Sequence, residues 1–588
     1  MEKKKVIMSG DEAIARGAWE AGVSVACAYP GTPSTEILEA MTQYDEIDAQ
    51  WAPNEKVALE FGFGASLGGA RTMVSMKHVG VNVAMDPLMT IAYAGVNSGL
   101  VLVSADDPNM FSSQNEQDNR NIARFARMAC FEPATPDEAR QFTKIAFEIS
   151  EKFDIPSMLR GTTRLCHGRG IVELNDRVEV LLKPYEKNCD KYMMLPSVCR
   201  VRRVDLEERL AELQKYADTM PINKIVKGDK KIGIITSGVA SMYAQEAMPD
   251  ASFLLLGMTN PLPWKLIDEF ADSVDTLYVV EELDPILETQ IKAAGIDCIG
   301  KDVISPFGEL STLAVKKGLD PDNAVDVVKD VKLQSPSRPP LLCPGCSHRP
   351  VFDALRRLKA TVTGDIGCYT LGANPPLSAM DMNLCMGASI GVGHGMEVAY
   401  KSGGKKRGRI AGVIGDSTFL HSGITPLLNL IYNQGSITVI LLDNSTTAMT
   451  GHQDHPGTGK TAKGLESPKV DYVKLAESIG VKHITTVNPL HVKKLRDILK
   501  TELDRDEPSL VICKAPCELH LRRKPTHYCQ VDADTCTSCG VCFKIGCPAI
   551  EKDENEKATI NKSLCVGCSV CVQVCSKNAM KLVAKGGA

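Results

Sequence analysis

Short apolar runs alternate with helical segments over residues 1–185. The runs VSVACAYP, TMVSM and LVLVSADDP are separated by stretches such as ALEFGFGASLGGA, whose apolar residues recur at helical spacing. Strands that alternate with helices along a chain pair in parallel, because each crossover helix returns the chain to the same end of the sheet. The pattern therefore predicts an α/β domain with a parallel sheet over this region.

The same alternation recurs twice further along the chain. Residues 186–228 are charged and include VDLEERLAELQKYA, which predicts a helical connector. The runs KIGIITSG, FLLLGM, TLYVVEE and CIGKDVI predict the strands of a smaller α/β domain over 229–331. The Pro- and Ser-rich segment KLQSPSRPP predicts a linker at 332–340, and a third α/β domain follows over 341–518.

The composition is that of an ordinary globular protein, with 44% hydrophobic and 24% charged residues. The 67 Lys and Arg against 72 Asp and Glu leave a net charge of −5, which gives no footprint for nucleic acid or an anionic membrane. The first lysines are not followed by the apolar segment of a secretory signal, and the chain has no run of about 18 apolar residues. We expect a cytoplasmic protein that binds neither nucleic acid nor membrane.

The last part of the chain is set apart by its cysteines. Of 21 cysteines, eight lie between Cys536 and Cys575, in the near-repeats CTSCGVCFKIGCP and CVGCSVCVQVCS. Regularly spaced thiols in a chain without a secretory signal indicate metal binding rather than disulfides. A zinc ribbon with Cys₄ sites is the alternative interpretation. Two repeats of three close cysteines plus a fourth favour iron–sulfur clusters.

These repeats resemble the bacterial-type ferredoxin domain with two 4Fe-4S clusters, over residues 528–588. In that domain the fourth cysteine of each repeat ligates the other cluster. The segment departs from the family pattern in the four-residue gap before Cys547 and in Ser576, where proline is common. The resemblance implies one cluster and then a second on the following ligands: Cys536, Cys539, Cys542 and Cys575; Cys565, Cys568, Cys571 and Cys547.

Two apolar runs in the third domain end in polar residues that could bind a metal. RIAGVIGDS and SITVILLDNSTT predict strands connected by the helical segment SGITPLLNLIYN. Ligands of parallel sheets bind at the carboxyl ends of the strands, where Asp416 and Asn444 would meet. Their oxygens suit Mg²⁺, and backbone N–H groups around Gly415, Ser417 and Thr418 could hold a diphosphate. The alternative is that these residues only end their strands, as turn residues do.

The two runs resemble the thiamine diphosphate motif, GDG followed by NN. Ser417 replaces the second Gly and Asp443 replaces the first Asn. The resemblance implies that thiamine diphosphate binds here through Mg²⁺. It assigns as metal ligands Asp416, Asn444 and the main-chain oxygen of Thr446.

The N-terminal domain carries AYPGTPSTEI and NEKVALEFGFGASLGGAR. These segments resemble the pyrimidine-binding domain of the thiamine-dependent 2-oxoacid:ferredoxin oxidoreductases. The resemblance implies a cofactor bound between this domain and the diphosphate domain, and a glutamate that exchanges a proton with the pyrimidine ring. It assigns that role to Glu55, with Glu60 as the alternative, and places Thr32 and His78 beside the substrate or cofactor. A solvated helix face for the glutamates and a structural role for His78 are the competing interpretations.

Four further cysteines could hold a third cluster. CPGCSHR, GDIGC and KAPC resemble the CPGCG, IGC and PC motifs of relatives that carry a cluster close to thiamine diphosphate. The ligands implied are Cys343, Cys346, Cys368 and Cys517. The alternative is that CPGC is a turn with buried thiols, since free cysteines are often simply buried.

Together these segments cover nearly the whole chain, and their order is informative. It resembles the large (alpha) subunits of the indolepyruvate branch of the thiamine-dependent 2-oxoacid:ferredoxin oxidoreductases, most closely in GDIGCYTLGANPP, GDSTFLHSGI and DNSTTAMTGHQ. The resemblance implies two thiamine-diphosphate-binding parallel-sheet domains, a smaller transketolase C-terminal-like domain and the ferredoxin domain. It also implies a smaller (beta) partner subunit within a hetero-oligomer. The implied reaction is the oxidative decarboxylation of an arylpyruvate with CoA to an aryl-acetyl-CoA and CO₂, with ferredoxin as the electron acceptor that is reduced.

Other functions explain only parts of the chain. A non-oxidative thiamine-dependent decarboxylase leaves the clusters unused, and an electron-transfer scaffold leaves Asp416, Asn444 and Glu55 unused. A nucleotide-dependent ligase would need a GxxxxGK[ST] segment, which the sequence does not contain. An oxidoreductase that acts on a non-aromatic 2-oxoacid fits equally well, because aromatic residues are only 5% of the chain and form no recognisable group.

Overall fold

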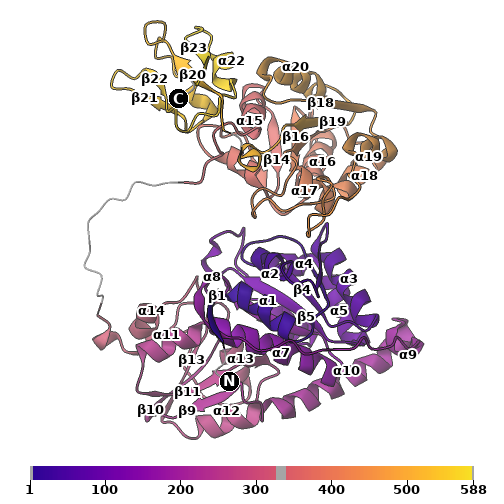
Figure 1. The fold of residues 1–588 in the computed structure, drawn as a ribbon, viewed down its shortest axis with the longest axis vertical. Coiled ribbons are helices and arrows are strands. Elements are labelled where there is room, and N and C mark those ends of the chain that lie inside the picture. The colour runs from indigo at the N-terminus through magenta and orange to yellow at the C-terminus, as the bar shows by residue number, and fades with distance from the viewer. Residues whose placement is uncertain (1–3, 326–338, 523, 586–588) are drawn as a thin grey trace. The chain divides into compact units, whose positions relative to one another are not determined.

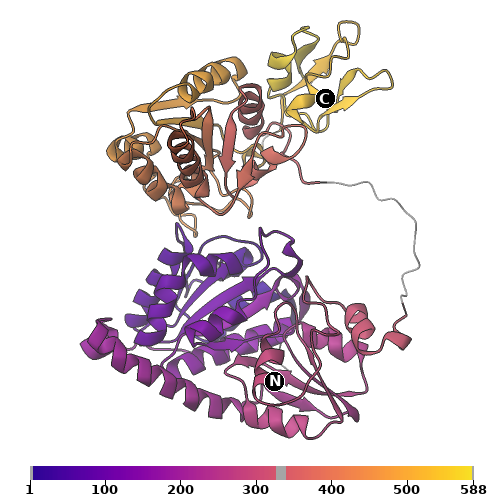
Figure 2. The same ribbon diagram turned by 180° about the vertical axis from the view of Figure 1, so that it is seen from behind.

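The computed structural model describes residues 4–325, 339–522 and 524–585 (Figure 1, Figure 2). The chain forms two compact α/β units, Met1–Leu333 and Gln334–Ala588. Residues 332–338 of the predicted linker lie outside the described residues. Among the residues that the structure describes, no helix is long and apolar enough to cross a membrane.

The first unit is built on a seven-stranded sheet in the order β12-β6-β7-β5-β4-β2-β3, and only the edge strand β12 runs antiparallel to its neighbour. Its strands are β2 (Val25–Ala28), β3 (Asp48–Trp51), β4 (Thr72–Lys77), β5 (Leu100–Asp106), β6 (Ala129–Phe131), β7 (Ser157–Thr162) and β12 (Met258–Asn260). Strands β4 and β5 are buried along their whole length, which explains their continuous apolar character in the sequence.

Helices cover both faces of this sheet. Val101 and Val103 of β5 pack in one core with α1 and α7, whereas Leu100 and Leu102 face α3 and α5, because successive strand residues point to opposite faces. The helices are α1 (Gly10–Glu20), α2 (Thr35–Met41), α3 (Glu55–Leu67), α4 (His78–Val83), α5 (Met85–Ala94), α6 (Arg120–Ala126), α7 (Pro136–Lys152) and α8 (Thr163–His167). A two-stranded antiparallel ribbon joins β1 (Lys5–Ser9) and β8 (Arg169–Glu173).

A four-stranded sheet in the order β13-β10-β11-β9 forms the smaller part of the first unit. Its strands are β9 (Lys224–Val226), β10 (Asp229–Ser237), β11 (Ala251–Leu256) and β13 (Thr276–Val280). The accompanying helices are α9 (Cys189–Tyr192), α10 (Pro196–Ala217), α11 (Ala240–Ala247), α12 (Trp264–Ala271), α13 (Ile286–Ala293) and α14 (Thr312–Leu319). The segment between β11 and α12 supplies β12 to the larger sheet, so the two sheets share one stretch of chain.

One predicted strand of this smaller part is wrong. The run CIGKDVI forms only an isolated bridge, from Ile299 to Tyr278. The next residues turn around the carboxylate of Glu288, whose Oε2 accepts the Lys301 N–H at 2.9 Å. The Lys301 N–H thus bonds to a side chain and not to a neighbouring strand, and no local pattern in the sequence predicts this contact.

The second unit contains a six-stranded parallel sheet in the order β15-β14-β16-β17-β19-β18. Its strands are β14 (Thr361–Gly364), β15 (Met382–Asn383), β16 (Ile410–Gly415), β17 (Thr438–Asp443), β18 (His483–Val487) and β19 (Ser509–Lys514). Its helices are α15 (His348–Arg357), α16 (Ala388–Ser402), α17 (Asp416–Thr418), α18 (Ile424–Tyr432), α19 (Tyr472–Ile479), α20 (Val492–Leu503) and α21 (Glu518–Leu521).

The cysteine-rich tail belongs to the second unit. It consists of two antiparallel ribbons, β20 (His527–Val531) with β23 (Met580–Ala584) and β21 (Ile550–Lys552) with β22 (Ala558–Ile560), and the short helix α22 (Val570–Val574). The Gln573 side chain joins the tail to the start of α20, because its Oε1 accepts the Val492 N–H at 3.0 Å and its Nε2 donates to the Leu490 carbonyl at 2.8 Å.

Candidate active site and metal centres

Three polar residues follow neighbouring strands of the second unit's sheet. Asp365 comes directly after β14, Asp416 after β16 and Asn444 after β17. These strands are adjacent and parallel, so their carboxyl ends meet at one edge. The sheet topology therefore brings together Asp416 and Asn444, as the sequence predicts, and adds Asp365.

Oxygen atoms converge around Asp416. The Asn444 side-chain oxygen lies 3.2 Å from Asp416 Oδ1 and 2.8 Å from the Thr446 main-chain oxygen, and rotating the amide would place its nitrogen there as a donor. Three acceptors that face one another repel unless a hydrogen or a cation lies between them. A carboxylate, an amide oxygen and a carbonyl form the donor set that Mg²⁺ prefers, so these residues fit the ion.

The Asp416 carboxylate also accepts hydrogen bonds from two main-chain N–H groups. Its Oδ1 accepts the Ser417 N–H at 2.9 Å and its Oδ2 accepts the Ser445 N–H at 2.8 Å. The N–H of Ser417 is therefore engaged in this structure, which differs from the predicted diphosphate cradle. Thr418 donates its hydroxyl to the Ile366 carbonyl at 3.2 Å, which fixes the start of α17 beside Gly415.

His455 is a neighbour of Asp416 that the sequence did not single out. Its Nδ1 accepts the Gly457 N–H at 3.1 Å, so Nε2 carries the proton, and Nε2 lies 3.5 Å from Asp416 Oδ2. Burial raises the pKa of Asp416, and His455 opposes that effect. Tyr472 is also buried at this edge, and its hydroxyl has no hydrogen-bond partner among the described residues.

Asp365 was also overlooked, although it stands in the quoted segment GDIGC. Burial raises the pKa of Asp365 to about 8. The carboxyl accepts hydrogen bonds from the Tyr369 hydroxyl and, at 2.9 Å, from the Ser389 hydroxyl. Burial thus favours the neutral form of this carboxyl, at the same edge as the oxygen donor set.

The predicted residues of the first unit also follow neighbouring strands. Thr32 comes after β2, Glu55 after β3 and His78 after β4, in a sheet where β2 lies between the other two. Glu55 opens α3 and is 6% exposed, and a Cβ added at Gly80 would lie 2.6 Å from its Oε1. Glu60 instead lies on the exposed face of α3, where it pairs with Lys56.

Two basic side chains are buried beside these residues. His78 is fully buried, its Nε2 contacts the Asn115 carbonyl at 3.2 Å, and its Nδ1 has no hydrogen-bond partner among the described residues. Burial lowers the pKa of His78, so the ring is neutral at physiological pH. Burial also lowers the pKa of Lys77, which the sequence did not suggest, to about 8, and its Nζ donates to the Ser112 carbonyl at 2.7 Å.

The four cysteines of the possible third cluster lie within electrostatic reach of one another. Burial raises the pKa of Cys346 to about 12, with Cys343 and Cys368 adding to the shift. Burial likewise raises the pKa of Cys368 to about 11, with contributions from Cys517 and Cys343. The Cys517 N–H donates to the Asn444 carbonyl at 3.0 Å, so this cysteine group adjoins the oxygen donor set.

Two cavities in the tail separate its cysteines into the two sets expected of a two-cluster ferredoxin. One cavity is lined by Cys536, Cys539, Cys542 and Cys575. A second cavity is lined by Cys547, Cys565, Cys568 and Cys571. Cys529 also lines the second cavity, and its N–H donates to Cys565 Sγ at 3.3 Å, so it belongs to that site's surroundings.

The CPGC loop and the tail meet at the second cavity, which Cys346 and Arg349 also line. Arg349 is buried and donates to the main-chain oxygens of Cys343, at 3.0 Å, and Ile545, at 3.3 Å. Gly345 has a φ of +74°, and a Cβ there would lie 2.3 Å from Val566 of the tail. The close approach therefore requires glycine in both conformation and size.

Three known protein families match successive segments of the chain, in the order expected from the sequence. Residues 16–209 match the family described as "Pyruvate flavodoxin/ferredoxin oxidoreductase, thiamine diP-bdg". Residues 365–513 match "Thiamine pyrophosphate enzyme, C-terminal TPP binding domain", and residues 558–581 match "4Fe-4S binding domain". The chain thus carries thiamine-diphosphate-binding domains and an iron–sulfur domain.

A solved structure of 2-oxoglutarate:ferredoxin oxidoreductase from Magnetococcus marinus is 16% identical and covers 54% of this chain and 64% of its own. Its TM-score of 0.46 is too low to carry weight in the assignment.

Relatives extend over nearly the full length. "Indolepyruvate oxidoreductase subunit IorA" of Archaeoglobus fulgidus is 40% identical over 99% of this chain and 98% of its own. The protein of the same name from Methanothermobacter thermautotrophicus is 39% identical over 100% of this chain and 98% of its own. Identity sustained at this level across both chains shows common descent, and the chain therefore belongs to the family of indolepyruvate oxidoreductase IorA subunits.

Proposed function

We propose that the chain is the catalytic large subunit of an enzyme that oxidatively decarboxylates indole-3-pyruvate and related arylpyruvates. In the balanced reaction, one arylpyruvate anion, one CoA and two oxidised ferredoxins give aryl-acetyl-CoA, CO₂, two reduced ferredoxins and one proton. The observation that carries the proposal is the oxygen set of Asp416, Asn444 and Thr446, which adjoins four clustered cysteines in a chain of this family.

Asp416, Asn444 and the main-chain oxygen of Thr446 would hold Mg²⁺ and, through it, thiamine diphosphate. When bound, thiamine diphosphate supplies the carbon that adds to the 2-oxoacid carbonyl and accepts the electrons released with CO₂. His455 would keep Asp416 ionised and oriented, since its Nε2–H faces Asp416 Oδ2. Asp365, with its raised pKa, would offer a neutral hydroxyl donor at the same edge.

Glu55 would exchange a proton with the pyrimidine ring of the cofactor. A general acid–base group must be held in one orientation and shielded from water, and Glu55 is buried against Gly80 at the start of α3. The exposed position of Glu60 and its pairing with Lys56 favour Glu55 for this role. Thr32 and the neutral His78 would contact the substrate. Thr32 follows β2 and His78 follows β4, and these strands end at the same edge of the sheet as β3, which precedes Glu55.

The cysteines would hold three 4Fe-4S clusters that remove the two electrons one at a time. The first would lie next to Asn444, on Cys343, Cys346, Cys368 and Cys517. The second would be held by Cys547, Cys565, Cys568 and Cys571. It would be the next cluster in the electron path, because Cys346 of the first set lines the same cavity. Arg349 would position the two cluster sites, since its guanidinium contacts the backbone of the CPGC loop and of the tail.

The proposed partners are a smaller (beta) subunit, ferredoxin and CoA. The relatives are named as subunits, which supports a hetero-oligomer. Two weaker candidates remain: a non-oxidative decarboxylase, which would release an aldehyde and leave the cysteine sites without a purpose, and an oxidoreductase for a non-aromatic 2-oxoacid.

The test is an anaerobic assay of the purified chain with its small partner subunit on a panel of 2-oxoacids. We expect viologen reduction that requires CoA and is fastest with indole-3-pyruvate or another arylpyruvate. Aldehyde release without viologen reduction would support the decarboxylase instead. A preference for 2-oxoglutarate or pyruvate would overturn the aromatic assignment but not the oxidative reaction.

A further inference from the structure

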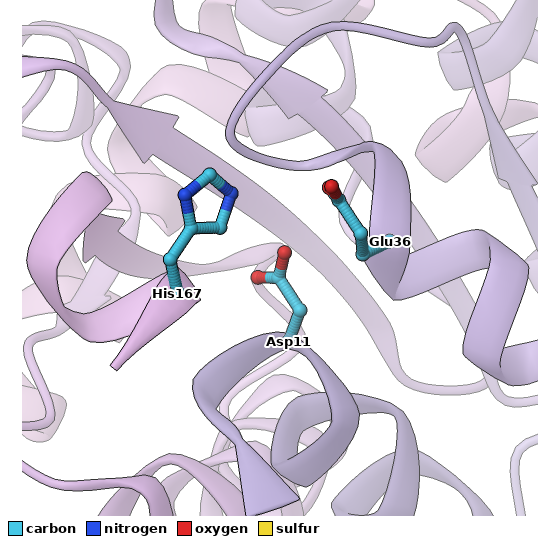
Figure 3. Close-up of side chains that lie close together, drawn as sticks. All are labelled: Asp11, Glu36 and His167. Atoms are coloured by element: carbon cyan, nitrogen blue, oxygen red, sulfur yellow. The ribbon is translucent and has the colours of Figure 1, made fainter. Parts of the chain in front are cut away.

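Three metal-ligand side chains meet on the first unit, apart from the residues discussed so far. Asp11 lies in the first turn of α1, Glu36 in the first turn of α2 and His167 at the end of α8 (Figure 3). One ligand atom of each lies within 4.8 Å of the others. Asp11 is buried, whereas Glu36 and His167 are exposed, so the group is open to solvent on one side.

The backbone fixes this meeting of α1 and α8. The Gly10 N–H donates to the Gly168 carbonyl at 3.1 Å, and a Cβ added at Gly10 would lie 2.1 Å from the Leu165 carbonyl oxygen. Only glycine allows so close an approach. Main-chain contacts thus fix the backbone positions from which Asp11 and His167 extend.

Asp11 is a buried carboxylate that no cationic side chain compensates in the contacts described. Its side chain is 0% exposed, and neither carboxylate oxygen has a hydrogen-bond partner among the described residues. The nearby Cys166 thiol is only a weak donor, so the buried carboxyl has no strong donor among the described residues. Glu36 brings a second carboxylate to the same point, which a cation would neutralise.

Glu20, on the same helix, shows how this fold compensates a buried carboxylate. It is also 0% exposed, but it accepts hydrogen bonds from Arg16 at 3.1 Å, Arg140 at 2.7 Å and the Asn175 N–H at 2.7 Å. These contacts lower the pKa of Glu20 despite the opposing effect of burial. No cationic side chain performs that role for Asp11 in the contacts described, and its nearest ligand-type neighbours are Glu36 and His167.

We propose that Asp11, Glu36 and His167 bind a divalent transition-metal ion, with Zn²⁺ the ion that best suits one imidazole and two carboxylates. Two negative charges neutralise the ion, and an imidazole nitrogen favours Zn²⁺ over Mg²⁺ or Ca²⁺. Water completes the coordination on the exposed side. The ion joins α1, α2 and α8, and so holds the first turn of α2, which follows the segment that contains Thr32.

The competing state is a protonated Asp11 with no metal. A neutral carboxylic acid still needs an acceptor for its O–H, and the Cys166 sulfur beside Asp11 is only a weak acceptor. Glu36 and His167 would then be unrelated solvated side chains. This alternative predicts that changes at the exposed residues leave metal content unchanged.

The test uses the full chain, prepared anaerobically with its clusters in place. Zn²⁺ bound per chain is measured by mass spectrometry after equilibration against a chelator-buffered Zn²⁺ solution. We expect His167→Ala and Glu36→Gln to hold one Zn²⁺ fewer per chain than the wild type, and to bind that ion at least about tenfold more weakly. Both residues are exposed, so these variants are expected to fold, and unchanged iron content checks that they do.

The matched control is His483→Ala, which removes a partly exposed histidine paired with Glu507 in the second unit. Zinc bound adventitiously to thiols occurs equally in all variants and cancels in the comparison. Asp11→Asn keeps the shape of the buried side chain and should lose the ion as well. Equal zinc content in the wild type, His167→Ala and Asp11→Asn, at whatever level, would overturn the proposal.

Discussion

The carboxyl edges of the two large sheets present polar residues in contrasting ways. At the edge of the second unit, oxygens of Asp416, Asn444 and Thr446 face one another with no hydrogen between them in the orientation described. At the edge of the first unit, Glu55 is buried close to Gly80, and His78 is buried with its Nε2 against the Asn115 carbonyl. Converging oxygen atoms suit a cation, whereas a buried acid held in one orientation suits proton exchange. One sheet architecture thus supports both tasks through the residues that follow its strands.

The largest loss of cofactor is expected from Asp416→Ala, which removes the only side-chain carboxylate proposed for Mg²⁺. Loss of a partner outside the coordination shell already costs about 10–100-fold in metal affinity, so loss of the ligand should weaken thiamine diphosphate binding by more than about 100-fold. Thiamine and iron contents measured on one sample provide the test. Iron should be unchanged, and wild-type thiamine content would remove Asp416 from the site.

Glu55→Gln tests the other edge. The amide fits the same buried space but cannot supply the proton, so activity should fall by about 10²–10⁴-fold while thiamine content stays near that of the wild type. Glu60→Gln is the matched control, because Glu60 lies five residues further along the same helix and is exposed. The assignment fails if activity survives in Glu55→Gln and collapses in Glu60→Gln.

Cys517→Ser tests whether the cysteines beside the carboxyl edge of the second unit's sheet hold an iron–sulfur cluster. About four of about twelve irons per chain should be lost, since a Cys₄-bound cube holds four. The tail cavities do not include Cys517, so their clusters should remain. Cys385→Ser, a change at an exposed cysteine outside all three proposed sets, should keep full iron content. Equal iron in both variants would reduce the four cysteines to buried thiols.

Gly80→Ala should act on Glu55 without changing it. The new methyl group would lie 2.6 Å from Glu55 Oε1 and must displace it, and a misplacement of about 1 Å can cost about 10²-fold in rate. Gly64→Ala is the control, because an added Cβ there meets nothing within 4 Å. Equal activity in the two variants would mean that the position of Glu55 is not critical.

The last prediction concerns stability rather than activity, and it is a pH dependence at the second edge. The pKa of Asp365 rises from 3.8 to about 8 on folding, so the native state holds a proton that the unfolded chain releases. Stability should therefore fall by about 1.4 kcal/mol per pH unit as pH rises through this window, and Asp365→Asn should remove that slope. Urea denaturation between about pH 5 and 8 measures it. Parallel slopes in wild type and variant would show that Asp365 is not neutral in the folded protein.

The sequence by itself determined the strands that alternate with helices, the order of the domains and the residue types of each site. Apolar runs such as TMVSM and LVLVSADDP are visible because buried parallel strands are apolar on both faces. Asp416 and Asn444 were predictable because each follows such a run directly. The tail cysteines were predictable because their spacing is local.

Tertiary structure alone decided which distant groups share an environment. His455 and Asp365 reach Asp416's edge through loops and strand order, and Arg349 reaches the tail across almost two hundred residues of chain. Glu55 and Glu60 lie on one helix, and only its packing leaves one buried and the other exposed. Burial and pKa shifts arise from atoms brought together by folding, so no local pattern encodes them, and the same holds for the meeting of Asp11, Glu36 and His167.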